Sequence, residues 1–303
     1  MDIAKGSCEL AFFQQESPVN NSLLKEILAR LAAGEIVPYL GPDALRGVVD
    51  RHSGQPIPAD SDSLILAMTG GQPMAPRLMY EFPRAAMHLE NKKGRSFIER
   101  FLTQTYGDDN WTPSPFHQWL ADLRLPYVID CNRDTQLQRC YADRAYTLIV
   151  GAARLTGSHY RFDLYRCEGG QSRRIEQAEV DPQLPVLFKP LGTPLPKPSF
   201  VASDADFVDY ITELMGGFAV PAWIKQQRRG KAYLFLGMHF NRDTERMLMS
   251  DLIHDAAAPA GWALIAEPSA KERKVCERKR LQLIEADCSE LFALAAPDAT
   301  RVA

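Results

Sequence analysis

Short apolar runs alternate along this sequence with longer segments of helical periodicity, and this alternation restricts the fold more than any other feature. The segments 20–34 and 204–215 repeat apolar residues every three or four positions, which is typical of helices packed on one side. Strands separated by such helices form a mostly parallel sheet covered on both faces. We therefore predict one α/β domain over residues 1–303, Rossmann-like and doubly wound. The clearest strand-like runs are EIVPYL (35–40), PYVIDC (126–131), LPVLFKP (184–190) and KAYLFLG (231–237).

Two segments depart from this alternation. In residues 141–182, the runs 146–151 and 160–180 alternate in the strand period around a Gly-Gly turn, which predicts an inserted β-hairpin element. Residues 50–80 are rich in Pro, Gly, Ser and Asp and predict a long loop with a short apolar piece.

Pro38 lies inside the first strand-like run. Proline has no N–H group to donate to a neighbouring strand, so it occurs mostly at sheet edges. We therefore predict that this strand lies at an edge of the sheet or ends early.

Charge and hydropathy exclude several classes of partner. A net charge of −3 and an isoelectric point near 6.1 give no basic signal for nucleic-acid binding. No apolar run approaches the ~20 residues that span a bilayer, and residues 1–15 lack the order of a secretory signal. We expect a cytoplasmic protein with neither a membrane nor nucleic acid as its partner.

The cysteines and histidines predict neither a metal site nor a disulfide scaffold. None of the six cysteines forms a C-x-x-C pair, and the six histidines show no metal-ligand spacing. We expect the cysteines to be free thiols, most of them buried.

The run 36–40 ends at Gly41, a junction that opens a nucleotide-binding loop in many α/β proteins. Such a loop binds phosphate by pointing several backbone N–H groups at the anion. Here Pro42 has no N–H to offer, and Asp43 adds a negative charge. Two unit charges about 4 Å apart repel by ~4 kcal/mol at an effective dielectric of 20. We expect Asp43 instead to cap the short helix 44–47.

Four motifs in this order resemble the SIR2-like (sirtuin-like) superfamily, in its divergent bacterial branch without the zinc module. The resemblance covers about residues 22–290 and implies a single SIR2-like domain with NAD at the carboxyl ends of the strands. The motifs are AAGEIVPYLGPDAL (32–45), FHQWLADLRLPYVIDCNRD (116–134), LPVLFKPLGTPLPKPSFVASDADFVDYI (184–211) and KAYLFLGMHFNRDTERMLM (231–249).

The resemblance assigns roles to individual residues. Leu191 stands where the family has its catalytic histidine, and leucine cannot accept a proton. If the protein were active, the catalytic residues would be Asn132, Asp134 and His239. The positions that match cofactor-binding residues, which we interpret as vestigial, are Gly41, Asn132, Gly192, Gly237 and Asp243.

Some of these residues also have an ordinary structural interpretation. Asn132 and Asp134 follow a strand, where Asn and Asp commonly form Asx turns or cap the next helix. Lys189 is expected to pair with an acidic neighbour such as Asp130.

Three functions follow from this combination of motifs and substitutions. The favoured one is a catalytically degenerate SIR2-like protein that binds another protein as a regulatory factor and needs no cofactor. Similarity to SIR2-like sequences among bacterial nitrogen-fixation genes makes nitrogenase the candidate partner. The alternative is an NAD hydrolase or ADP-ribose-handling enzyme, and the third is a binder of another nucleotide or small metabolite. The candidate binding surfaces are the segments 50–80, 141–182 and 190–198.

Overall fold

The computed structural model describes residues 18–107, 109–153 and 159–296. Its centre is a nine-stranded sheet in the order β11-β10-β9-β1-β2-β6-β3-β4-β5. All neighbouring strands are parallel except β3–β4 and β4–β5, so the predicted α/β fold with a mostly parallel sheet is confirmed. The strands are β1 (Ile36–Leu40), β2 (Tyr127–Asp130), β3 (Tyr146–Gly151), β4 (Phe162–Glu168), β5 (Gln171–Ile175), β6 (Val186–Lys189), β9 (Ala232–Leu236), β10 (Gly261–Leu264) and β11 (Leu281–Ile284).

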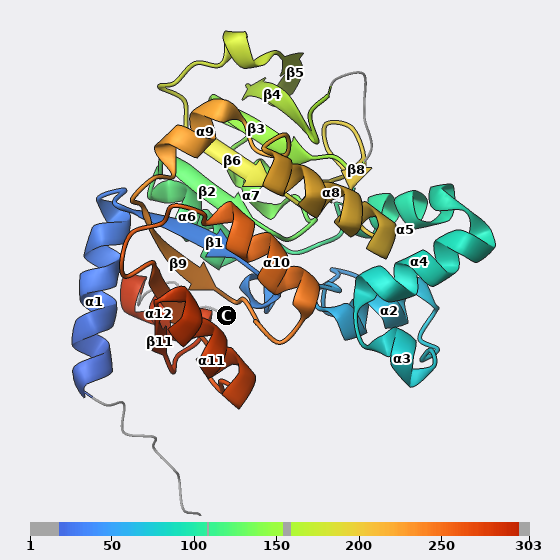
Figure 1. Cartoon of the computed structure of the whole chain (residues 1–303), viewed down its shortest axis with the longest axis horizontal. Coiled ribbons are helices and arrows are strands. Elements are labelled where there is room, and N and C mark those ends of the chain that lie inside the picture. Colours follow the sequence, from blue (N-terminus) through green and yellow to red (C-terminus); the bar gives the residue numbers. More distant parts are fainter. Residues whose placement is uncertain (1–17, 108, 154–158, 297–303) are drawn as a thin grey trace, which may run out of the picture.

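Helices cover both faces of this sheet (Figure 1). Successive side chains of a strand point to opposite faces, and in β1 Tyr39 belongs to one buried apolar cluster while Leu40 belongs to the other. The first face packs against α8 (Asp204–Gly216), α9 (Ala222–Gln227), α10 (Asp243–Leu252) and α11 (Ala270–Lys279). The second packs against α1 (Pro18–Ala32), α6 (Pro115–Asp122), α7 (Gln136–Cys140) and α12 (Cys288–Ala295).

The strand order reverses direction at β1. The chain adds β2, β6 and β3 on one side of β1, and β9, β10 and β11 on the other. This doubly wound arrangement is consistent with the predicted Rossmann-like architecture. In such sheets the point of reversal, here between β1 and β9, is where ligands bind beyond the strand ends.

The predicted hairpin within 141–182 is confirmed. Strands β4 and β5 pair in antiparallel fashion around Gly169 and Gly170, which both have positive φ. The preceding strand β3 is part of the main sheet, so the hairpin extends that sheet at its edge. A separate two-stranded sheet joins β7 (Gly192–Thr193) to β8 (Ser199–Phe200).

The prediction that Pro38 places its strand at an edge is wrong, because β1 lies between β9 and β2. Leu40 accepts from Cys131 on the β2 side, and Gly41 donates to Leu236 on the β9 side. Backbone groups alternate between the two sides of a strand, so the missing donor of Pro38 faces β2. Pairing between β1 and β2 starts only at Tyr39 although β2 already begins at Tyr127, so the central strand lacks a ladder bond at Pro38.

A small helical module, residues 57–107, packs beside the strand ends. The prediction of a long loop over 50–80 is wrong, because its apolar piece forms α2 (Ser61–Met68), capped by the Asp60 side chain, and α3 (Pro76–Met79) follows. With α4 (Phe82–Lys93) and α5 (Arg95–Gly107), these helices enclose a third apolar cluster that includes Phe200. Arg95 fixes the module to the sheet domain, because it pairs with Asp206 and donates to the carbonyl of Phe200 at 2.8 Å.

Candidate functional site

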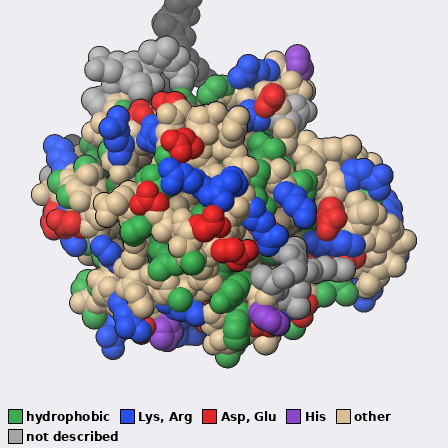
Figure 2. Space-filling view, turned by 90° about the horizontal axis from the view of Figure 1, so that it is seen from above, with side chains coloured by type: hydrophobic (Ala, Val, Ile, Leu, Met, Phe, Trp, Pro, Cys, Tyr) green, Lys and Arg blue, Asp and Glu red, His purple; other side chains and the backbone are tan. Residues whose placement is uncertain are grey.

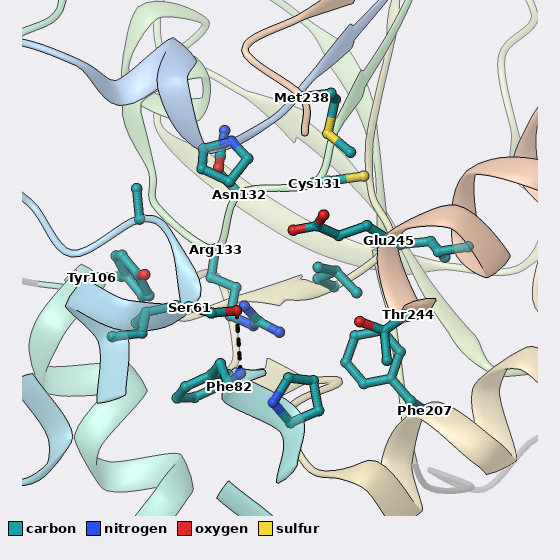
Figure 3. A pocket seen from close by; sticks show the side chains of 16 residues that line it. Ser61, Phe82, Tyr106, Cys131, Asn132, Arg133, Phe207, Met238, Thr244 and Glu245 are labelled. Carbon is teal, nitrogen blue, oxygen red and sulfur yellow. Dashed lines mark hydrogen bonds between the residues drawn. The ribbon is translucent and has the colours of Figure 1, made fainter. Parts of the chain in front are cut away.

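The carboxyl ends of β1, β2, β6 and β9 meet at one edge of the sheet and border a pocket. These strands are neighbours and parallel, so the four sequence motifs that contain them lie side by side in the sheet. We call this space the strand-end pocket. Its volume is about 660 Å³ when the part that is open to solvent is counted. Its strand-end residues are Pro42, Cys131, Asn132, Arg133, Leu191 and Met238, and the helical module and helices α8 and α10 form its other walls (Figure 3).

The loops after β1 and β9 pack directly against each other at the point where the strand order reverses. A Cβ atom on Gly41 would lie 2.3 Å from Sδ of Met238 and 2.6 Å from the carbonyl oxygen of Gly237. A Cβ on Gly237, which has φ +69°, would lie 2.5 Å from the backbone nitrogen of Ala44. Both glycines therefore allow the loops after β1 and β9 to approach each other closely. Met238, in the second of these loops, also borders the strand-end pocket.

The backbone donors of the β1 loop are all used within the chain. Gly41 donates to Leu236 at 2.9 Å, Asp43 to Gly237 at 3.0 Å, and Ala44 to Gly41 at 3.1 Å. Pro42 has no donor. A phosphate cradle requires free N–H groups that point outward, so residues 41–44 do not form one.

Asn132 joins the β2 loop to the β1 loop. Its Nδ2 donates to the carbonyl oxygen of Gly41 at 2.8 Å, and its backbone N–H donates to Oδ1 of Asp130 at 2.9 Å. Asn132 is one of the residues that border the strand-end pocket, as the resemblance implied. Its amide donor, however, already has a partner within the chain.

The predicted pairing of Lys189 with Asp130 is confirmed. Lys189 Nζ donates to Oδ2 of Asp130 at 2.6 Å, and both side chains are fully buried. Burial raises the pKa of Asp130 to about 6, and the Lys189 charge opposes that shift. Asp134 lies 3.8 Å from Lys189, and its Oδ1 accepts from the backbone N–H of Gln136 at 2.7 Å. Asp134 thus forms the Asx turn that its position after a strand suggested, and it does not border the pocket.

Asp43 does not cap the helix at 44–47, so that expectation is wrong. Asp43 lies inside the 3-10 helix Pro42–Leu45, whose N-cap is Gly41 without a side-chain bond. The Asp43 carboxylate instead accepts from Arg46 at 3.2 Å and bonds His239 Nε2 at 3.0 Å. The hydrogen bond to Asp43 raises the pKa of His239 against its burial. Burial would raise the pKa of Asp43, but the bond and charge of His239 outweigh it and lower that pKa.

His239 is held away from the strand-end pocket. It borders a second pocket on the other side of Met238, at the ends of β9, β10 and β11, together with Asp43 and Asp287. His239 Nδ1 also lies 3.6 Å from Oε1 of Glu272. The catalytic candidates from the sequence were Asn132, Asp134 and His239. The structure does not place His239 at the same pocket as Asn132.

Two further expected cofactor positions serve the fold. Gly192 has φ +90°, and a Cβ there would lie 1.9 Å from the carbonyl oxygen of Ser199 in the partner strand. Asp243 begins α10, where its exposed side chain pairs with Arg246. Neither residue borders the strand-end pocket.

The sequence reasoning missed the two charged residues that do enter this pocket, Arg133 and Glu245. Figure 3 shows both side chains directed into the space. The Oε2 atom of Glu245 is buried without a hydrogen-bond partner, and burial raises the pKa of this carboxyl to about 7. Arg133 lies between Asn132 and Asp134 in the motif itself. In the sequence, Glu245 cannot be told from other acidic residues that commonly occupy the first turn of a helix. Only the tertiary structure shows that it borders the pocket.

Arg133 is only 7% exposed. Its Nη2 donates to the carbonyl of Val201 at 2.6 Å, and its guanidinium lies 5.3 Å from the ring centre of Phe82. Its Nε is buried without a partner, and burial lowers the pKa of the group. Arg133 is thus held in place by the chain while one of its donors is unused.

The described residues contain no cluster of three or more His, Cys, Asp or Glu side chains that would suit a metal ion. Across the same part of the chain, no helix has the length and apolar character needed to cross a membrane. Figure 2 shows basic and acidic side chains intermixed on the face that it presents. In the β4–β5 hairpin, Arg166 pairs with Glu168, and Arg173 pairs with Glu179, which follows the hairpin. No protein-family model matches the chain, and no curated protein matches it significantly.

Proposed function

We propose that this chain is a catalytically degenerate SIR2-like protein that acts as a protein-binding regulatory factor, with nitrogenase as its candidate partner. The observation that carries the proposal is the use of every N–H of residues 41–44 inside the chain. A protein that binds NAD through this loop would need those donors for the diphosphate. Here the loop stabilises the junction of β1 and β9 instead.

The position of Leu191 supports the loss of catalysis. Leu191 borders the strand-end pocket where the family's histidine base would act. Loss of a general base typically removes a factor of 10²–10⁴ in rate. His239 does not replace that base, because Asp43 and Glu272 hold it at the neighbouring pocket.

The tip of the β7–β8 hairpin supports a role in protein binding. Residues 195–198 are exposed, while Gly192 and Phe200 pair at the base of the hairpin. Gln138 Nε2 donates to the carbonyl of Leu195 at 3.1 Å and fixes the start of the tip. A segment already fixed in place loses little conformational freedom when a partner binds.

An apolar patch on α8 and α10, which the sequence reasoning did not identify, is the second candidate surface. Val208 and Met215 lie seven residues apart on α8, and Met215 is 78% exposed. Met215 and Met247 of α10 border a common groove, with Arg246 and Lys279 beside them. Exposed apolar side chains gathered in this way are a feature of protein-interaction surfaces.

The test measures binding of the purified chain to purified nitrogenase proteins by biolayer interferometry, at physiological ionic strength. We expect saturable binding that Leu195→Asp or Met215→Asp weakens at least tenfold. Ala29→Asp, at an exposed position of α1 outside all the candidate surfaces, is the matched control and should bind as the wild type does. An absence of binding to every nitrogenase protein would refute nitrogenase as the partner.

One observation favours the alternative, an NAD hydrolase. Glu245 has a pKa of about 7 and borders the same pocket as Asn132, and a carboxyl of this kind suits general acid–base catalysis near neutral pH. The test is to incubate the purified protein with NAD and to measure nicotinamide release by chromatography. The alternative would be established, and the proposal overturned, if the wild type released nicotinamide and the Glu245→Gln variant did not. Circular dichroism must show that the variant is still folded.

A further inference from the structure

The strand-end pocket combines mostly apolar walls with two oppositely charged side chains, each of which has one buried polar atom without a hydrogen-bond partner. Glu245 Oε2 and Arg133 Nε are both buried without a partner. Buried charged groups in proteins are normally paired, because an unsatisfied one has lost its hydration without gaining a partner. Both side chains point into one open space, so a ligand in that space is the simplest source of the missing partners (Figure 3).

Most of the rest of the wall is apolar, and its other polar members are Ser61, Tyr106, Asn132 and Thr244. Its largest side chains come from the helical module on one side and from α8 and α10 on the other. An apolar wall with a few polar groups at fixed places is the usual construction of a small-molecule site. The apolar wall residues are Pro42, Ala59, Leu64, Phe82, Pro83, Leu191, Phe207, Met238 and Leu248.

The two charged groups define the chemistry of the ligand. A carboxylate such as that of Glu245 accepts from an ammonium group, and a guanidinium such as that of Arg133 donates to a carboxylate. A ligand that satisfies both carries an ammonium and a carboxylate group on an apolar body. We propose that the strand-end pocket binds a small zwitterion of this class, an α-amino acid with an apolar side chain.

This site is distinct in chemistry from a dinucleotide site. Its recognition requires no phosphate cradle, which residues 41–44 do not provide because their donors are bonded within the chain. Its walls come from both the sheet domain and the helical module, so an occupant would contact Phe82 of the module and Phe207 of α8 together. The inference is independent of the identity of any protein partner.

The experiment is a thermal-shift series followed by titration calorimetry with the full chain. The probes are L-phenylalanine and L-leucine, with 3-phenylpropionate lacking the ammonium group and 2-phenylethylamine lacking the carboxylate. We expect a zwitterion to stabilise the protein in a saturable way and to bind at least tenfold more tightly than either half-analogue. A ligand specific to the folded state raises stability with its concentration, which makes the thermal shift a direct measure of occupancy.

Two variants connect binding to the pocket. Glu245→Gln keeps the size of the side chain but removes the anion, so the zwitterion should bind at least tenfold more weakly while 3-phenylpropionate binds as before. Ala59→Leu fills the pocket and keeps both charges, and it should reduce binding of every probe. Glu267→Gln, an exposed carboxylate that borders the neighbouring pocket, is the matched control and should bind as the wild type does.

Two results would overturn the inference. One is the absence of any saturable shift with either amino acid at millimolar concentration. The other is binding that does not distinguish the zwitterion from its half-analogues and is unchanged in both Glu245→Gln and Ala59→Leu. NAD is titrated in parallel, and a preference for NAD over every amino acid would also count against the proposal.

Discussion

No side chain fits at Gly41, because a Cβ there would lie 2.3 Å from Sδ of Met238 in the β9 loop. This contact closes the sheet edge where the strand order reverses, the position at which open α/β sheets bind ligands. The Asn132 amide, which donates to the Gly41 carbonyl, secures the same loop from the β2 side. The three loops therefore support one another, and the open space lies beside them in the strand-end pocket.

Gly41→Ala tests whether this glycine serves chain packing. The added methyl meets the backbone carbonyl of Gly237 at 2.6 Å, which cannot move as easily as a side chain. Overpacking of this kind typically costs about 1–3 kcal/mol, and we expect a loss of that size in urea denaturation. Gly216→Ala is the control: its Cβ would have only ordinary contacts in α8, so it should be neutral or slightly stabilising. Equal stability of the two variants would contradict the packing role.

Lys189→Met should be strongly destabilising. It leaves the Asp130 carboxylate fully buried without its 2.6 Å partner, and breaking a buried pair typically costs about 3–5 kcal/mol. Without Lys189 the pKa of Asp130 should rise further, so the loss should be larger at pH 8 than at pH 5. The double variant Lys189→Met with Asp130→Asn removes both charges and should recover part of the loss. Urea denaturation at the two pH values measures all three proteins.

The sequence predicted the sheet well because each strand carries its own signal. Buried runs such as 232–236 are apolar throughout, and Ser203 with Asp206 forms a capping box at the start of α8. Pro38 misled the prediction of an edge strand, because its missing donor faces only β2, while β1 pairs along its whole length with β9 on the other side.

The site was predicted less completely than the fold. The convergence of Gly41, Asn132 and Gly237 follows from the parallel topology, and the order of the four motifs, through their resemblance to the SIR2-like superfamily, had suggested it. The pocket's other wall includes Ser61, in the segment 50–80 whose Pro and Gly content indicated a loop, and Phe82, which follows that segment. The role of Glu245 depends on burial between elements, which no local pattern records.

His239→Gln should reveal a pH-dependent contribution from the His239–Asp43 pair. The pKa of His239 is raised, so its contribution is complete below the unfolded-state pKa and is lost as the pH rises through the folded-state pKa. The pKa of Asp43 is lowered, so its contribution is lost as the pH falls through that lowered value. The stability difference between wild type and variant should therefore be largest at weakly acidic pH and fade above neutrality. His239 is 38% exposed, so we expect less than about 1 kcal/mol.

The matched measurement follows the imidazole protons of His239 by NMR during a pH titration. We expect a midpoint above the ordinary value of a histidine side chain. Asp43→Asn should lower the midpoint of His239, because it removes the hydrogen-bonding carboxylate. An unchanged midpoint in that variant would show that the pair does not set the protonation of His239.

Glu245→Gln should stabilise the unliganded protein above neutral pH. The pKa of Glu245 is raised to about 7 by burial, and the charge of Glu81 adds to that effect while those of His239 and Arg242 oppose it. The folded state therefore holds a proton that the unfolded state has released between about pH 4.5 and 7, and stability falls with rising pH across that window. The accumulated loss is about 3 kcal/mol at most above pH 7. Glutamine cannot ionise, so the variant should lack this loss.

The measurement is the free energy of unfolding of the wild type and of Glu245→Gln, each at pH 4 and at pH 8. We expect the variant to gain relative to the wild type as the pH rises, and Glu267→Gln, with its exposed carboxylate, to show no such gain. Addition of a bound zwitterion should reverse the order, because its ammonium group compensates the Glu245 charge and favours the ionised carboxylate. A stability difference that is the same at both pH values would mean that Glu245 is ionised without cost in the folded protein. The pocket would then lack the unsatisfied charge on which ligand recognition depends.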